Sequence, residues 1–312
     1  MLGYAIKRVL WLIPTLLAVT LLTYFIMELT PGSPFDPGAG NGVSPQTVAR
    51  LEALYGLDKP WYERYVIYVG NAIQGDFGES YAYQPQQVSD IIARTLPVSL
   101  HLGLMATAFA IILGMTLGIL AAVNQNGLID YITVTIAILF YSMPNFVMGF
   151  VLILLFAVWL PGYGIDLGLR PSGWSGPKDW ILPTIALGAA PLATIARYTR
   201  SSMIDVIRSD YVRTARAKGL AQRKVILKHV LKNALIPVVT LIGPIFAIVG
   251  TGSFFVEKIF NVPGMGKFYV ESMQSSDQTM ILAVVLIFGA FLAVMNLIVD
   301  LLYGLIDPRI RY

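Results

Sequence analysis

The chain has 312 residues, of which 56% are hydrophobic and only 13% are charged, and it contains no cysteine. Soluble domains usually carry about a quarter charged residues, so this deficit indicates a chain that folds in lipid. The lack of cysteine excludes disulfides, thiolate metal sites and a cysteine nucleophile. The formal net charge is +4, and its distribution along the chain is more informative than its sum.

The first predicted element is a membrane-spanning helix over 9–29, within the N-terminal segment 1–29. Lys7 and Arg8 precede an apolar run that is longer than the core of a signal peptide, which has about 7–15 residues. No small-residue cleavage site follows the run, and 30–34 has the composition of a turn. We therefore expect a retained helix rather than a cleaved leader.

The segment 30–97 is predicted to be an extracytoplasmic domain with two helices. Ser44-Pro45 starts a helix with an apolar stripe, which Gly56 can end. A second amphipathic helix is expected over 61–74, with its apolar side formed by Trp61, Tyr65, Tyr68, Val69 and Ala72. The segment holds four basic and seven acidic residues. It forms a packed cap over the membrane helices, a docking surface, or both.

Five further apolar segments lie in 98–312, which is predicted to be a membrane-embedded core of five helices. A bilayer crossing needs roughly 20 apolar residues, and the expected spans are 98–123, 131–159, 181–199, 237–256 and 281–305. The fourth and fifth of the six spans contain Gly and Pro, which are tolerated where neighbouring helices or a water-filled path satisfy the backbone. The predicted fold class is all-α, a polytopic membrane protein with six transmembrane helices.

The distribution of Lys and Arg predicts the orientation of these helices. With the N-terminus inside, 14 of the 22 basic residues fall in cytoplasmic segments and eight outside. Four of those eight lie in 30–97, which is long enough for the rule to give them less weight. Both termini are therefore expected in the cytoplasm.

The cytoplasmic loop 197–236 is the most informative part of the chain. It contains ten basic residues and two acids. A short helix is expected over 209–220, capped by Ser209 or Asp210 and ended by Gly219 in a left-handed conformation. Ala215 and Ala217 are small, so a partner surface could approach closely. The alternative is a positive-inside anchor that touches anionic lipid headgroups.

Several motifs resemble one family, the permease subunits of binding-protein-dependent ATP-binding-cassette importers, in the oligopeptide, dipeptide and nickel branch. The cytoplasmic run Asp210-Tyr211-Val212-Arg213-Thr214-Ala215-Arg216-Ala217-Lys218-Gly219 is similar to the coupling motif of that branch. The other matching runs are Pro31-Gly32-Ser33-Pro34, Tyr55-Gly56-Leu57-Asp58-Lys59-Pro60, Gly75-Asp76-Phe77-Gly78, Arg197-Tyr198-Thr199-Arg200-Ser201-Ser202-Met203, Asn233-Ala234-Leu235-Ile236-Pro237, Glu257-Lys258-Ile259-Phe260, Pro263-Gly264-Met265-Gly266 and Asp307-Pro308-Arg309-Ile310.

The resemblance implies a type I importer transmembrane domain in the prokaryotic plasma membrane. It implies a second permease subunit, two cytoplasmic ATPases that bind ATP and Mg, and an external solute-binding protein. This chain would then carry no cofactor, bind no nucleic acid and catalyse no reaction. The residues implied to contact the ATPase are Asp210, Tyr211, Arg213, Thr214, Ala215, Arg216, Ala217, Lys218 and Gly219.

The motif departs from the wider superfamily, in which it opens with Glu-Ala-Ala. Here Arg213 and Thr214 occupy the first two places, and only Ala215 and Gly219 are kept. The superfamily's later proline would fall at Lys232, whereas this chain has Pro237. Any role that needs the absent glutamate is therefore in doubt.

No motif for intrinsic catalysis or metal binding is present. Gly266-Lys267 lacks the earlier glycine and the following Ser or Thr of a phosphate-binding loop. His101 and His229 are expected on opposite sides of the membrane, so they cannot share a site. Asp300 lies within the sixth span, and we expect it near the inner end, where it caps a helix or pairs with a base, although intramembrane charge can be functional.

Candidates for the solute pathway are polar and helix-breaking residues at mid-membrane depth: Ser142, Pro144, Asn145, Gly243, Pro244, Gly250, Thr251 and Gly252. The competing interpretation is helix packing alone, which is also the expected role of the small-residue spacing at Gly114 and Gly118. The expected function is oligopeptide or dipeptide import. The alternatives are import of nickel or another small solute, an intramembrane enzyme, and a carrier that needs no ATPase.

Overall fold

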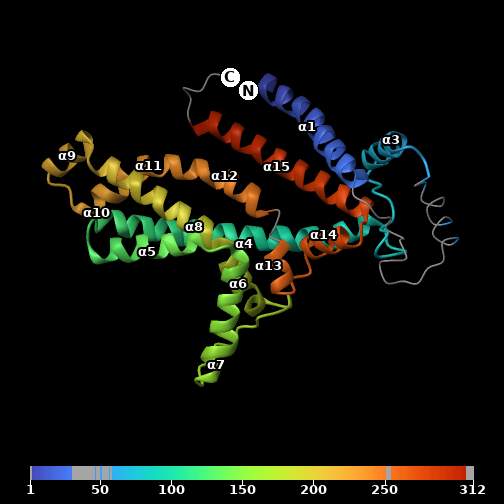
Figure 1. Cartoon of the computed structure of the whole chain (residues 1–312). Helices are drawn as coiled ribbons and strands as arrows, with labels where there is room; N and C mark the ends of the chain where they lie inside the picture. Colours follow the sequence, from blue (N-terminus) through green and yellow to red (C-terminus); the bar gives the residue numbers. More distant parts are fainter. Residues whose placement is uncertain are drawn as a thin grey trace. The chain divides into compact units, whose positions relative to one another are not determined.

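The computed structural model describes the backbone of residues 2–29, 46, 50, 56, 58–250 and 254–306, and the side chains among them from 6 to 299. The described chain is helical (Figure 1), and its one β-bridge joins Glu79 to Gln87. The helices are α1 (Leu2–Leu29), α3 (Trp61–Ala72), α4 (Val88–Val123), α5 (Leu128–Ser142), α6 (Asn145–Ile153), α7 (Leu160–Gly162), α8 (Pro177–Ile207), α9 (Asp210–Ala217), α10 (Gln222–Lys224), α11 (Leu231–Ala234), α12 (Ile236–Gly250), α13 (Phe254–Ile259), α14 (Met265–Gln274) and α15 (Gln278–Ile306). Two π-helical stretches, η2 (Leu154–Trp159) and η3 (Val225–Val230), continue α6 and α10.

The chain forms two compact units. The first contains Met1–Val98 and Gly264–Leu297, and the second contains Ser99–Pro263 and Ile298–Tyr312. The long helices α4 and α15 contribute to both units. Within the described residues, five helices or helical stretches are long and apolar enough to cross a membrane, and a sixth is added if the bent pair 222–234 and 236–250 is one span. The helical, polytopic fold predicted from the sequence is confirmed.

The first unit packs α3 against α1, and α14 and α15 against the start of α4. Tyr65 on α3 donates a hydrogen bond from its hydroxyl to the Leu17 carbonyl at 2.9 Å, and Arg64 pairs with Glu28 at 2.7 Å. A separate core of Val88, Ile91, Ile92, Met265, Met280, Ala283 and Val284 joins α4, α14 and α15. Helix α3 matches the second predicted outer helix, whereas the first, over 44–56, lies outside the described residues apart from single positions.

The start of α4 corrects the predicted second span. The sequence placed the start at 98, directly after Pro97, but the helix begins at Val88 and carries Pro97 inside it. A proline inside a helix removes one backbone hydrogen bond and its ring crowds the carbonyl four residues earlier, so the helix needs compensating contacts to continue past it. The buried side chains of Val88 and Ile91 pack into the first unit, which stabilises the extra turns.

The second unit is built on a close seam between α4 and α8. A Cβ added at Gly114 would lie 2.8 Å from the Leu192 carbonyl oxygen, and one at Gly118 would lie 2.6 Å from the Ala196 carbonyl oxygen. A Cβ added at Gly188 on α8 would likewise lie 2.8 Å from the Ala106 carbonyl oxygen on α4. The two helix backbones can approach this closely only because these residues have no side chain. The predicted packing role of Gly114 and Gly118 is confirmed.

The third predicted span, 131–159, was wrong as a single helix. Helix α5 ends at Ser142, and α6 begins at Asn145 and leaves α5 at a steep angle (Figure 1). Between them Met143 is extended (φ −91°, ψ 123°), as a residue before proline tends to be. Pro144 therefore divides the apolar run into two helices.

Helices α8 and α12 also differ from their predicted bounds. Helix α8 spans Pro177–Ile207 rather than 181–199, with Pro177 in its first turn, where a missing N–H costs nothing. Helix α12 ends at Gly250, and the helical stretch before it, 222–234, meets it at 51°. Much of the predicted cytoplasmic loop is therefore helical.

Candidate functional site

The predicted cytoplasmic helix is present as α9, and its own core holds it. Val212 and Ala215 are buried on one face of α9, against Met203 and Ile204 at the end of α8. Val225, Val230 and Ala234 close the same core from η3 and α11. Because a short exposed helix is marginal by itself, this packing fixes the position of α9.

The termini of α9 only partly follow the prediction. Gly219 has φ +76°, and its N–H donates to the Arg216 carbonyl at 2.9 Å, as expected for a left-handed helix end. Ser209 occupies the N-terminal cap position, but its hydroxyl donates to the Val206 carbonyl at 2.7 Å and does not cap the helix. Asp210 is exposed and pairs with Arg213 at 3.6 Å. Side-chain capping by either residue was therefore wrong.

The outward face of α9 is polar and basic. Tyr211, Arg213, Thr214, Arg216, Ala217 and Lys218 are all exposed. The Tyr211 hydroxyl accepts a hydrogen bond from the Asn233 side chain at 2.8 Å, which ties this face to α11. Ala215, which was expected on the partner-facing side because it is small, points instead into the core of the segment.

Positive charge surrounds this face. The eight basic residues between α8 and α12 are exposed without exception: Arg208, Arg213, Arg216, Lys218, Arg223, Lys224, Lys228 and Lys232. The two acids of the segment, Asp205 and Asp210, are exposed as well. The stretch 208–232 therefore presents a strongly cationic surface, which suits an acidic protein groove or anionic lipid headgroups.

An ion pair that the sequence analysis did not identify lies beside this segment. Arg200 on α8 donates from Nε and Nη2 to the two Asp130 carboxylate oxygens at 2.5 and 2.7 Å. The Asn126 N–H also donates to Asp130 at 2.9 Å, from a left-handed residue with φ +62°. The pair fixes the turn between α4 and α5 to α8. The sequence signal for this pair was the position of Asp130, an acid directly before the predicted span 131–159.

The pathway candidates fall at two places in the second unit. Ser142, Pro144 and Asn145 form the break between α5 and α6. A Cβ added at Gly243 on α12 would lie 1.8 Å from Val299 Cγ2. One added at Gly103 on α4 would lie 2.5 Å from the Cα of Gly250 on α12.

Gly243 and Gly250 thus serve close helix packing, whether or not they also line a path. Pro244 is half-buried inside α12. Thr251 and Gly252 lie outside the described residues.

The histidines occupy unrelated environments. His101 on α4 makes edge-to-face contacts with Trp174 and Trp180, at centroid distances of 5.6 and 4.9 Å. His229 lies in η3, in the basic segment. Among the described residues no group of three His, Cys, Asp or Glu side chains could hold a metal ion. The Asp300 side chain lies outside the described residues.

Known protein families and relatives match this chain over almost its whole length. Residues 114–312 match the family described as binding-protein-dependent transport system inner membrane component, and residues 1–103 match the N-terminal family of such membrane components. The oligopeptide transport system permease protein OppB of Haemophilus influenzae is 43% identical, covering 100% of both chains. The dipeptide transport system permease protein DppB of Bacillus subtilis is 44% identical, covering 99% of this chain and 97% of its own.

A solved structure supports the same fold. The MetNI methionine ABC transporter in an inward-facing conformation matches with a TM-score of 0.50 and 18% identity, covering 70% of this chain and 96% of the other. At this identity the likeness concerns the arrangement of helices alone. The two family matches, which leave only 104–113 uncovered, and the full-length relatives show that the chain belongs to the family of inner-membrane components of binding-protein-dependent transport systems.

Proposed function

We propose that this chain is the permease subunit of an ATP-driven importer for oligopeptides or dipeptides, and that it forms half of the translocation pathway. The observation that carries the proposal is the full-length identity of 41–44% to permeases named for oligopeptide and dipeptide transport. The chain itself performs no catalysis. ATP and Mg are bound by partner subunits.

The proposed partners are a second, similar permease, two cytoplasmic ATPases and an external solute-binding protein. The family description, which names a binding protein, supports the last of these. The basic outward face of α9 is the proposed ATPase contact, formed by Asp210, Tyr211, Arg213, Thr214, Arg216, Ala217 and Lys218. We assign Ala215 and Gly219 a supporting role, because one is buried and the other ends the helix.

In this arrangement both termini and α9 lie in the cytoplasm, and the segment 30–97 lies outside. Nucleotide-dependent states of the ATPases bind α9 differently, and this difference shifts the permease between two access states. Because α9 packs on the end of α8, a displacement of α9 is passed directly to a membrane helix.

Uptake by the reconstituted complex tests the proposal. Proteoliposomes with all subunits and ATP should accumulate radiolabelled dipeptides or short oligopeptides, and unlabelled peptide should compete. Saturable nickel uptake without any peptide uptake would identify the small-solute alternative instead. Peptide uptake by this chain in liposomes that contain no ATPase would contradict the coupling part of the proposal.

A further inference from the structure

The helical stretch 222–234, which leads into α12, carries four exposed basic residues: Arg223, Lys224, Lys228 and Lys232. The sequence contains no acid from 211 to 256. None of the four cations forms an ion pair with an acid among the described residues. Clusters of about four to eight Lys and Arg residues directly beside a membrane helix are typical of surfaces that bind anionic lipid.

Packing determines which way these cations point. Val225 and Val230 on η3 are fully buried, five residues apart, and a π-helix brings such residues to the same side. They share a core with Ala122, near the end of α4, and with residues of α8. Leu227 and Lys228 lie midway between the two valines in this turn and are exposed. The basic face therefore points away from α4 and α8, out of the helix bundle.

The level of this face in the membrane follows from its neighbours. The candidate span Val88–Val123 ends one residue after Ala122, which packs in the same core as η3. The stretch 222–234 meets α12 at 51°. Because membrane helices tilt by only about 20° on average, such a bend inclines the stretch toward the membrane plane. The basic face therefore lies at the level of the lipid headgroups.

An apolar side chain lies among the cations. Leu227 is 55% exposed, and it lines one open hollow together with Ala221, Arg223, Lys224 and Lys228. Long basic side chains at a membrane interface place their charge among the headgroups, while neighbouring apolar side chains enter the acyl region. A phospholipid offers a phosphate to the cations and an acyl chain to Leu227, whereas a free phosphate ion offers only the first.

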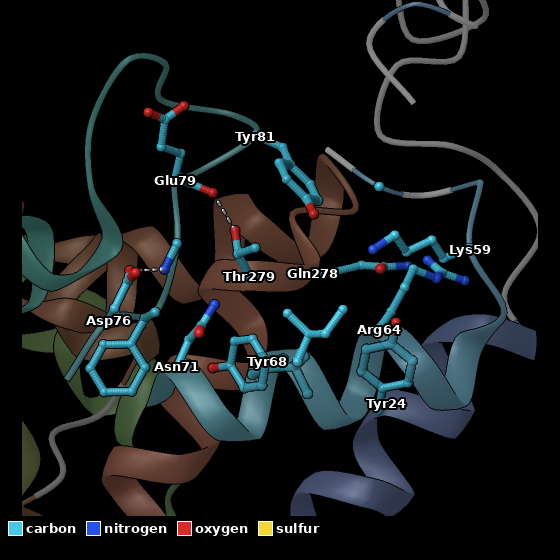
Figure 2. Close-up of a pocket in the computed structure, with 15 residues that line it drawn as sticks. Tyr24, Lys59, Arg64, Tyr68, Asn71, Asp76, Glu79, Tyr81, Gln278 and Thr279 are labelled. Carbon is cyan, nitrogen blue, oxygen red and sulfur yellow. Dashed lines mark hydrogen bonds between the residues drawn. The ribbon is translucent and has the colours of Figure 1, made fainter. Parts of the chain in front are cut away.

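Cations that line the cavity beside α3 are in a different state. Figure 2 shows Lys59 and Arg64 at this cavity, within the first unit. Lys59 pairs with Glu63 at 3.5 Å, and Arg64 pairs with Glu28 at 2.7 Å. Their charge is neutralised within the protein, whereas the charge on α10 and η3 is available to a ligand.

We infer that the face formed by Arg223, Lys224, Leu227 and Lys228 binds the headgroup of an anionic phospholipid in the cytoplasmic leaflet. This face is distinct from the outward face of α9, which is the proposed ATPase contact. The bound lipid anchors η3 and, through the core that η3 shares with α9, supports the position of α9. The inference rests on the proposed function for the side of the membrane on which these helices lie.

The test follows thermal unfolding of the full-length chain in dodecyl maltoside micelles titrated with phosphatidylglycerol, phosphatidylcholine or inorganic phosphate. A ligand that binds only the folded chain raises its melting temperature, so phosphatidylglycerol should raise it and the other two should not. The triple variant Arg223→Gln, Lys224→Gln, Lys228→Gln should need at least about tenfold more phosphatidylglycerol, since each base near an anionic surface contributes about fivefold in affinity. Leu227→Ser should also weaken the response, without any change in charge.

The matched control removes three charges from the outward face of α9, by Arg213→Gln, Arg216→Gln and Lys218→Gln. This variant should keep the response to phosphatidylglycerol and lose capture of the ATPases in a pull-down, and the variant on η3 should do the opposite. Equal lipid responses of the two triple variants would refute the inference, because net charge alone would then explain the effect.

Two further outcomes would overturn the inference. Loss of ATPase capture by the variant on η3, with an unchanged lipid response, would assign this face to the ATPase. A rise in melting temperature with inorganic phosphate equal to that with phosphatidylglycerol would show a simple anion site. Peptide uptake by the complete complex is measured separately, so the proposed function can hold even when this face binds no lipid.

Discussion

At the scale of single residues, small size at Ala215 and Gly219 has two different physical reasons. Ala215 is buried where α9 packs against α8, η3 and α11, whereas Gly219 has the left-handed conformation that ends α9. Neither reason requires an ATPase to touch the residue. A size series that includes Ala217, which is exposed on the same helix, separates internal packing from partner contact.

We expect Ala215→Trp to lower the thermal stability of the chain, because overpacking a core typically costs about 1–3 kcal/mol. Ala217→Trp should leave stability unchanged but prevent the ATPases from binding. Both variants should abolish uptake. Thermal unfolding and pull-down of the ATPases distinguish them, and an Ala217→Trp variant that binds the ATPases normally would remove Ala217 from the contact.

Gly219→Val should also abolish uptake and the stimulation of ATP hydrolysis by loaded binding protein. At φ +76° a side chain costs about 1–2 kcal/mol, and a β-branched one costs more. Gly219→Asn is the control, because asparagine tolerates this conformation and should keep most activity. Equal, full activity of both variants in reconstituted complexes would show that the helix end is not needed.

The Asp130–Arg200 pair is the second residue-scale feature. The Asp130 side chain is only 4% exposed and that of Arg200 is 28% exposed, so removing one partner leaves a poorly solvated charge. We expect Arg200→Gln to destabilise the chain by about 2–4 kcal/mol, toward the lower side of the range for buried pairs because Arg200 is partly exposed. Asp130→Asn with Arg200→Gln should cost less than the sum of the single variants in thermal unfolding. Strict additivity would mean that the two side chains do not interact.

At the scale of elements, sequence periodicity and length were sufficient to predict most helices but not their breaks. Segment 61–74 was predicted as an amphipathic helix, and α3 occupies 61–72. Its aromatic side packs on α1, through the contact between Tyr65 and Tyr24. Pro97 and Pro144 have opposite outcomes, one inside a helix and one at a break. The difference lies in tertiary packing around the proline, which a single sequence does not contain.

The seam between α4 and α8 yields an element-scale prediction. A methyl group at Gly118 would lie 2.6 Å from the Ala196 carbonyl oxygen, which is backbone and cannot move aside. Gly118→Ala should therefore destabilise the chain by about 1–3 kcal/mol, as overpacking does. Gly70→Ala in α3 is the matched control: nothing lies within 4 Å of its added Cβ, so it should be neutral or slightly stabilising. The same melting temperature for both variants would argue against a tight seam.

The candidate site around α9 was also predictable only in part from the sequence. The residues of α9 and the left-handed Gly219 follow from local composition, because capping and helix propensity are local properties. The burial of Ala215 and the Asp130–Arg200 pair were not predictable, because each depends on residues that are distant in sequence.

At the scale of the whole molecule, the orientation in the membrane decides whether α9 can meet an ATPase at all. The prediction rests on the excess of Lys and Arg in the segments placed inside, 14 of 22. The chain contains no cysteine, so single cysteines can be introduced without background labelling. Cysteine at Asp76 or Asp166 should react with a membrane-impermeant maleimide added outside intact cells, and cysteine at Lys218 should react only after the membrane is opened. All three positions are exposed and outside the candidate spans, so access to the reagent depends on their side of the membrane. Labelling of Lys218→Cys from outside would reverse the topology and would remove α9 as the ATPase contact.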